Sequence, residues 1–310
     1  MAYIFTYLLV TQIKRNDLKI IVILITLESV FIFIEIFLGE TTIFTSNPDY
    51  RSGLSFDALY LIRPFGLSDG TNSMGGKLVI AIILLDYLWE PSRLKQFNKY
   101  FLFLALIIVF SRTAIYASLL HYLIYYIKVA KVRHKLLKIF AFLAIVGLAN
   151  FTIIDIPWEL ITEQLNRGKE DGIDLSYRDV IWSDCWRFIT SHPLLGNGSS
   201  RYYIWLSTAQ MYEHAHNSFL NLLATNGFLI SGVYLLWIFS RQPLDNIKIT
   251  LPIIVFSIGQ FGVFWGISFM DIIFLYLMLE KPSKYSSASI IRYIKAFVIN
   301  AKSRRQDNYV

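Results

Sequence analysis

The chain has 310 residues, of which 55% are hydrophobic and 16% are charged. A soluble domain carries about 25% charged residues, so this composition and its long apolar runs exclude an ordinary soluble protein and indicate a membrane bundle. The single cysteine, Cys185, excludes an internal disulfide framework and a cysteine-based zinc site. The net charge of +7 does not indicate a nucleic-acid partner, because the basic residues are distributed by membrane side.

The apolar runs predict about nine membrane-spanning helices, since a helix needs roughly 20 mostly apolar residues to cross a bilayer. We place them near residues 1–13, 20–38, 76–90, 100–111, 113–128, 137–154, 217–240, 249–263 and 265–280. The predicted fold class is an all-α integral membrane protein, a polytopic helical bundle with outer loops at 39–75 and 155–216. Residues 1–280 form the membrane domain. Residues 281–310 form a basic tail that is either an amphipathic helix on the inner leaflet or a disordered segment.

The positions of Lys and Arg support this scheme. All short basic loops and the tail fall on one side and hold 20 of the 29 Lys and Arg residues, so that side is predicted to be cytoplasmic and the N-terminus to lie outside. Residues 100–128 are ambiguous. Lys99 and Lys128 both belong inside, which requires an even number of crossings, so we predict a helical hairpin whose turn is Ser111-Arg112-Thr113. A single helix would instead put the large loop in the cytoplasm.

Two arginines are candidates for binding an anion. Arg112 lies between two apolar spans, where a charge is costly and therefore a functional candidate, although it could also snorkel to the outer interface. Ser176 and Asp179 fit a capping box, so a helix is predicted to begin here and to stop before Pro193. Arg178 would then add bidentate donors to the free N–H groups of the first helical turn. The alternative for Arg178 is a solvated loop arginine.

A histidine pair lies directly before the predicted span at 217–240, in the sequence Glu213-His214-Ala215-His216-Asn217. The positive end of a helix dipole disfavours imidazolium, so a histidine here is predicted to be neutral and able to act as a general base. The alternative is a pair of interfacial histidines without chemistry. A metal site would need more ligands than the one neighbouring acid, so none is predicted.

Other polar residues near the spans admit two interpretations. Arg63-Pro64-Phe65-Gly66, with Asn72 and Gly75-Gly76, is predicted to form a shaped loop, in which Arg63 is a further anion contact or part of an outer turn. The acids inside the apolar runs could form a proton or ion path, or pair with nearby polar groups; they are Glu28, Glu35, Asp86 and Asp271. The chain has no Asp-x-Asp pair and no P-loop, which argues against an ordinary sugar-nucleotide transferase.

In their order and spacing, these residues resemble the O-antigen ligase and polymerase family over roughly residues 50–280. The family has a Ser-Arg-Gly/Thr-like turn between spans, here Ser111-Arg112-Thr113-Ala114. Its large outer loop has an Arg, an aromatic helix and a Pro-Leu-x-Gly-x-Gly turn, here Arg178, Trp182 and residues 193–198. The loop ends in a His-Asn or His-Ser pair followed by nine residues and Gly, here His216-Asn217 and Gly227. Ile230 stands where the family has Gly, Thr or Tyr.

The resemblance implies a lipid-sugar transferase (GT-C-like) fold in the bacterial cytoplasmic (inner) membrane, acting at its outer face. It implies a metal-independent, inverting glycosyltransferase without a cofactor, which moves a glycan from an undecaprenyl-pyrophosphate-linked oligosaccharide to a hydroxyl of an acceptor glycan in surface polysaccharide assembly. His216 would be the general base, and Arg112 and Arg178 would bind the pyrophosphate. Additional site candidates are Arg63, His214 and Asn217.

Polymerase is favoured over ligase, because Ile230 departs from the ligase form and the chain is short. A chain-length regulator and a flippase are the expected protein partners. Two other functions stay open. A lipid-linked glycan transporter would place its polar groups at mid-membrane on broken helices, and a non-catalytic assembly scaffold would not depend on His216.

Overall fold

The structure is a computed structural model that describes residues 2–40, 42–43, 64–129, 178–198, 200–206, 211–241, 246–260 and 262–280. The predicted span at 137–154, Arg63 and the tail at 281–310 lie outside these described residues. The same holds for residues 44–62 and 155–177, which include much of the two predicted outer loops.

The described part is mostly helical, as the apolar runs predicted. In chain order its elements are α1 (Ala2–Val10), α2 (Arg15–Leu38), α3 (Thr71–Leu88), α4 (Arg93–Val109), α5 (Arg112–Val129), α8 (Arg178–Ser191), β1 (Ile204–Leu206), β2 (Met211–Glu213), α9 (Ser218–Arg241), α10 (Ile247–Gly259) and α11 (Phe269–Leu279). The strands β1 and β2 form an antiparallel hairpin in which Trp205 is opposite Tyr212.

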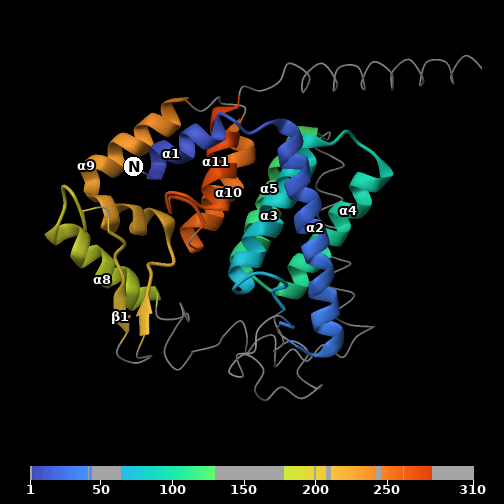
Figure 1. The fold of residues 1–310 in the computed structure, drawn as a ribbon, viewed down its shortest axis with the longest axis horizontal. Coiled ribbons are helices and arrows are strands. Elements are labelled where there is room, and N and C mark those ends of the chain that lie inside the picture. The colour runs from blue at the N-terminus through green and yellow to red at the C-terminus, as the bar shows by residue number, and fades with distance from the viewer. Residues whose placement is uncertain are drawn as a thin grey trace, which may run out of the picture.

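The helices form two groups that lie side by side (Figure 1). The first group holds α2, α3, α4 and α5; the second holds α1, α9, α10 and α11, with α8 packed against α9. α10 joins the groups because it packs on both α5 and α3. Every residue of α3 from Leu78 to Leu85 is buried, as expected for a helix that is apolar around its whole circumference.

Three helices in the described ranges are long and apolar enough to cross a membrane, namely α2, α3 and α9. α10 and α11 are apolar but have only 13 and 11 residues. At 1.5 Å per residue they extend about 17–20 Å, less than a bilayer core of roughly 30 Å. The predicted span at 1–13 is α1, a nine-residue helix packed on α11. The chain is therefore a mostly helical integral membrane protein.

The turn between α4 and α5 confirms the predicted helical hairpin. α4 ends at Val109, Phe110 has a left-handed backbone with φ 51°, and α5 begins at Arg112. Ser111 is fully buried in the turn and donates a hydrogen bond from its hydroxyl to the Asn72 side chain at 3.2 Å. A single helix through residues 100–128 is thereby excluded.

The prediction that Asn72, Gly75 and Gly76 belong to a shaped loop is wrong, because all three lie in the first turns of α3. A Cβ added at Gly75 would lie 2.7 Å from the Ser111 Cβ, so the glycine permits close packing of α3 on the hairpin turn. Gly75 therefore serves helix packing and does not form a turn. The sequence signal was misleading because two adjacent glycines usually mark loops.

Each of the four acids inside the apolar runs accepts a hydrogen bond from a nearby donor. The pairs are Glu28 with Lys77 Nζ (2.8 Å), Glu35 with the Gly66 amide (2.8 Å), Asp86 with Lys99 Nζ (2.6 Å) and Asp271 with the Trp265 amide (3.0 Å). Of the two interpretations of these acids, the structure favours pairing with polar groups over an ion path.

Candidate functional site

The backbone before α9 is held in a fixed conformation. The side-chain oxygen of Asn217 accepts hydrogen bonds from the amides of Phe219 (2.9 Å) and Leu220 (3.1 Å), so Asn217 is the N-cap of α9. His216 precedes it with φ 44°, in the left-handed region that few residues other than glycine adopt. Such strained residues cluster at functional sites, where the surrounding structure imposes their conformation.

α8 places Arg178 near this segment. Arg178 is the first described residue of α8, while its predicted cap, Ser176, lies outside the described residues. The indole N–H of Trp182 donates to the carbonyl of Ala215 at 2.8 Å, which ties α8 to the residue between the two histidines. A small apolar core joins the same elements and consists of Ile181, Cys185, Ile204 and Ala215. Arg178 and His216 are therefore positioned by elements that share one core.

His216 is held as a neutral imidazole. Its burial and the positive charge of Arg178 lower its pKa to about 4, from an ordinary value of 6.5. The sequence predicted a neutral imidazole from the helix dipole, whereas the structure identifies burial and a neighbouring guanidinium as the causes. Arg178 thus lies close enough for its charge to act on His216. At neutral pH the ring is therefore able to accept a proton.

His214 and His216 are part of a series of side chains in contact. Their ring centroids are 4.2 Å apart, and the His214 ring meets Trp265 edge-on at 6.1 Å. The guanidinium carbon of Arg201 lies 3.9 Å from the centre of the Trp265 ring. Sequence reasoning missed both Arg201 and Trp265. The described residues contain no group of three or more His, Cys, Asp or Glu side chains placed to hold a metal ion.

The loop between α10 and α11 connects this segment with the start of α5. The Ser218 hydroxyl accepts hydrogen bonds from the amides of Gly262 (3.0 Å) and Val263 (3.1 Å), so the loop lies against the start of α9. Gly259, at the end of α10, closely approaches Thr113 in the first turn of α5. The structure therefore groups the two histidines with Arg178. It places the exposed Arg112 at the start of α5, the helix that meets the end of α10 just before this loop.

The turn after α8 docks on a kink in α9. Gly227 has φ 69° and ψ 177° and interrupts the helix. A Cβ added there would lie 2.3 Å from the Leu194 carbonyl oxygen, and one added at Gly196 would lie 2.5 Å from the Ala224 carbonyl oxygen. Two backbone hydrogen bonds close the contact, from Phe228 to Pro193 (2.7 Å) and from Asn197 to Ala224 (2.8 Å). Gly196 and Gly227 therefore allow the backbone of this turn to lie directly against the backbone of α9.

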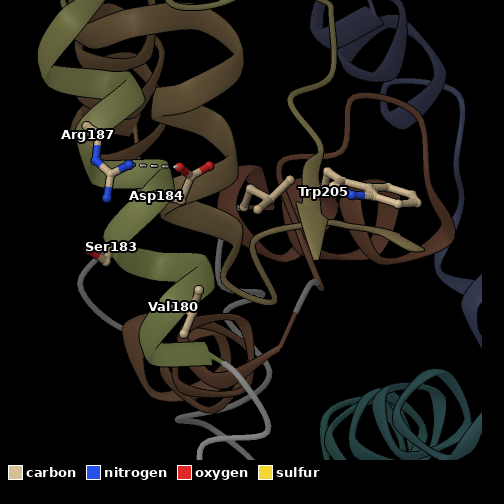
Figure 2. A pocket seen from close by; sticks show the side chains of 6 residues that line it. Val180, Ser183, Asp184, Arg187 and Trp205 are labelled. Carbon is tan, nitrogen blue, oxygen red and sulfur yellow. Dashed lines mark ion pairs between the residues drawn. The ribbon is translucent and has the colours of Figure 1, made fainter. Parts of the chain in front are cut away.

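An open hollow of about 640 Å³ lies between α8 and β1. Its lining residues are Val180, Ser183, Asp184, Arg187, Ile204 and Trp205. Figure 2 shows Asp184 paired with Arg187 on α8, 3.7 Å apart, while the Trp205 ring projects away from that helix. None of the predicted site residues lines the hollow, so it is a neighbouring surface rather than the arginine and histidine site.

Fold and site together define a helical membrane protein with guanidinium and imidazole groups gathered beside the start of one helix. The O-antigen ligase family matches residues 98–235, which run from α4 into α9 and include Arg112, Arg178 and His216. Residues 98–235 are thus similar to the O-antigen ligase family, which the motifs in the sequence also resemble. No curated protein matches the chain. The family points to glycan transfer of the ligase or polymerase type.

Proposed function

We propose that the chain transfers a glycan from an undecaprenyl-pyrophosphate-linked donor to a sugar hydroxyl at the outer face of the bacterial inner membrane. The observation that carries the proposal is the half-buried His216, which has a left-handed backbone and lies next to α8, the helix that contributes the cation Arg178. The family and the membrane helices support a lipid-linked donor. We favour polymerisation over ligation because Ile230 departs from the ligase pattern.

In this mechanism the acceptor hydroxyl oxygen attacks the anomeric carbon of the donor while His216 takes the hydroxyl proton. The bond between that carbon and the pyrophosphate oxygen breaks, and the undecaprenyl pyrophosphate leaves with the electron pair. Attack opposite the leaving group inverts the anomeric centre. Arg178 and Arg112 stabilise the departing diphosphate by charge and bidentate hydrogen bonds, the role that a metal ion has in other transferases.

Donor binding strengthens the base in this mechanism. An imidazole with a pKa of about 4 is a weak base toward a hydroxyl at neutral pH. The diphosphate brings negative charge beside Arg178 and offsets the field that disfavours imidazolium. The pKa of His216 therefore rises when the donor binds, and the base is strongest in the complex that needs it.

The two other functions have less support. A transporter would use polar groups in the membrane as a path, but the four acids in the described spans are held by local hydrogen bonds. A scaffold would have no need for a strained, half-buried histidine beside an arginine. A chain-length regulator and a flippase remain the partners that we propose for a polymerase.

Single substitutions test the proposal in a strain whose surface polysaccharide depends on this gene. Arg112→Gln, Arg178→Gln and His216→Asn should each remove the long-chain polysaccharide ladder at normal protein levels. His214→Asn should reduce the ladder less, since His214 is not the proposed base. Unchanged ladders in all three variants, with normal expression, would eliminate the assignment.

A further inference from the structure

Arg201 is fixed at both ends although it lies on the surface. Its guanidinium stacks 3.9 Å above the Trp265 ring. Its backbone carbonyl accepts a hydrogen bond from the Asn197 side chain at 3.2 Å, and the same amide group binds the Ser200 carbonyl at 3.1 Å. A surface arginine ordinarily loses conformational entropy when it binds a ligand, and this one has already lost part of it.

Trp265, whose ring is the platform that supports the Arg201 guanidinium, is itself held in place by a hydrogen bond of its backbone. Its amide donates to Asp271 at 3.0 Å, and the Ser268 hydroxyl donates to the same carboxylate oxygen at 2.8 Å. The Trp265 ring meets His214 edge-on, and the His214 ring lies next to that of His216 at a tilt of 42°. Arg201 thus stands at one end of a continuous series of contacts, and Arg178 acts on the other end through His216.

The chemistry of the stacked guanidinium favours an anionic ligand. Stacking uses the flat face of the group, while its five N–H donors lie in the plane and are directed away from the ring. Those donors match the oxygens of a phosphate in a bidentate arrangement. A diphosphate has two such groups, and the histidine segment has one arginine at each end.

We infer that Arg201, stacked on Trp265, is a third diphosphate contact at the donor site, which shares the ligand with Arg112 and Arg178. The inference rests on the proposed function and specifies how its donor is held. Arg201 would approach the diphosphate from the side of the site where Trp265 and His214 lie. The alternative role of Arg201 is an interfacial anchor that has no ligand.

The test measures lipid binding by the purified full-length protein in nanodiscs of zwitterionic lipid. The probes are undecaprenyl pyrophosphate and undecaprenyl monophosphate without any sugar, which removes acidic sugars as the source of binding. Arg201→Gln should weaken binding of the pyrophosphate about tenfold and that of the monophosphate by clearly less. Arg201→Lys should recover part of the loss, because a lysine keeps the charge without the fork.

Two further variants separate the role of the platform from misfolding. Trp265→Phe keeps an aromatic face and should bind nearly as well as the wild type, whereas Trp265→Leu should behave like Arg201→Gln. Arg187→Gln is the matched control, since its side chain is 77% exposed and lies on the outer part of α8, and it should bind both lipids normally. The thermal unfolding temperature of each variant should equal that of the wild type, so that a loss of binding is not caused by misfolding.

Wild-type binding of both lipids by Arg201→Gln would overturn the inference and leave Arg201 as an anchor. The proposed function fails separately, when His216→Asn and Arg178→Gln keep full transfer activity. Loss of transfer in those two variants with normal lipid binding by Arg201→Gln would reject the inference alone.

Discussion

The charge of Arg178 acts directly on His216, and a pH experiment can isolate that effect. Burial and Arg178 together hold the pKa of His216 at about 4. A nearby positive charge disfavours imidazolium, so its removal raises the pKa, while burial remains and keeps it below 6.5. The acidic limb of kcat/KM, which reports the free enzyme, should therefore move to higher pH in Arg178→Gln than in the wild type.

The measurement uses the residual transfer activity of each variant, normalised to its own plateau above pH 7. Arg187→Gln on the same helix serves as the control, because its exposed side chain has Asp184 as its partner. Its acidic limb should coincide with that of the wild type. A limb that stays in place or moves to lower pH in Arg178→Gln would contradict the proposed electrostatic contact.

Single residues differed in how well their roles could be predicted. A helix at Arg178 that stops before Pro193 was predicted correctly, because capping and proline signals are local. The neutral state of His216 was predicted, although from the helix dipole rather than from burial. Arg201 and Trp265 were missed, because their contact depends on how the loop after α10 folds back against α9, and no local pattern encodes it.

The contact between the turn after α8 and the kink of α9 should tolerate no side chain at Gly227. An alanine there would have to adopt φ 69° and ψ 177°, a combination almost confined to glycine, at a cost of about 1–3 kcal/mol, and would also overlap the Leu194 carbonyl. Gly227→Ala should therefore lower the thermal stability of the solubilised protein and expose the α8 region to limited proteolysis.

Gly232 provides the matched control in the same helix. A Cβ added at Gly232 meets nothing within 4 Å, so Gly232→Ala should leave stability unchanged or raise it by about 0.5–1 kcal/mol. Equal effects of the two alanines would show that α9 is merely sensitive to substitution.

A buried ionic cluster ties α3, α4 and α5 together. Asp86 pairs with Lys95 (3.4 Å), Lys99 (2.6 Å) and His121 (3.2 Å). The side chains of Asp86 and Lys95 are each only 5% exposed, so Asp86→Asn would leave buried lysines without their carboxylate. Loss of one partner of a buried pair costs about 3–5 kcal/mol, and the variant should unfold at much lower temperature.

The double variant Asp86→Asn with Lys99→Met tests the electrostatic cause. Removal of one lysine relieves part of the uncompensated charge, so the double variant should be more stable than Asp86→Asn alone. If it is less stable by the sum of both single effects, the cluster is held by packing rather than by charge. Thermal unfolding followed by retention of soluble protein in detergent provides the measurement.

Helix positions were easier to predict than helix starts. The hairpin at Ser111 followed from counting basic residues, because charge and membrane side are physically linked. The start of α3 was placed too late, since its first turns are polar and contain two glycines that serve close packing. Polar helix starts and close helix contacts depend on the neighbouring helix, which a single segment does not reveal.

The two opposite ends of the helix bundle carry different functional groups. Contacts between segments that are distant in the sequence identify each end. At one end, the start of α3 packs on the hairpin turn between α4 and α5, and the start of α5 packs on the end of α10. At the same end, the start of α9 contacts the loop between α10 and α11. At the other end Arg15 donates to the Tyr87 carbonyl at 3.2 Å, and the Tyr87 hydroxyl donates to Glu280 at 2.5 Å. The histidine site belongs to the first end and the buried lysines to the second.

The positive-inside rule assigns the lysine end to the cytoplasm, and cysteine labelling can test this. In a Cys185→Ala background, Asp69→Cys would report on the histidine end and Glu90→Cys on the lysine end, because both positions are exposed and Cys185 is buried. In spheroplasts, a membrane-impermeant maleimide should label position 69 and not position 90, while lysed cells should show label at both. The reverse pattern would put Arg178 and His216 in the cytoplasm, where a glycan already flipped outward is absent. It would therefore reject both the orientation and a transfer reaction at the outer face.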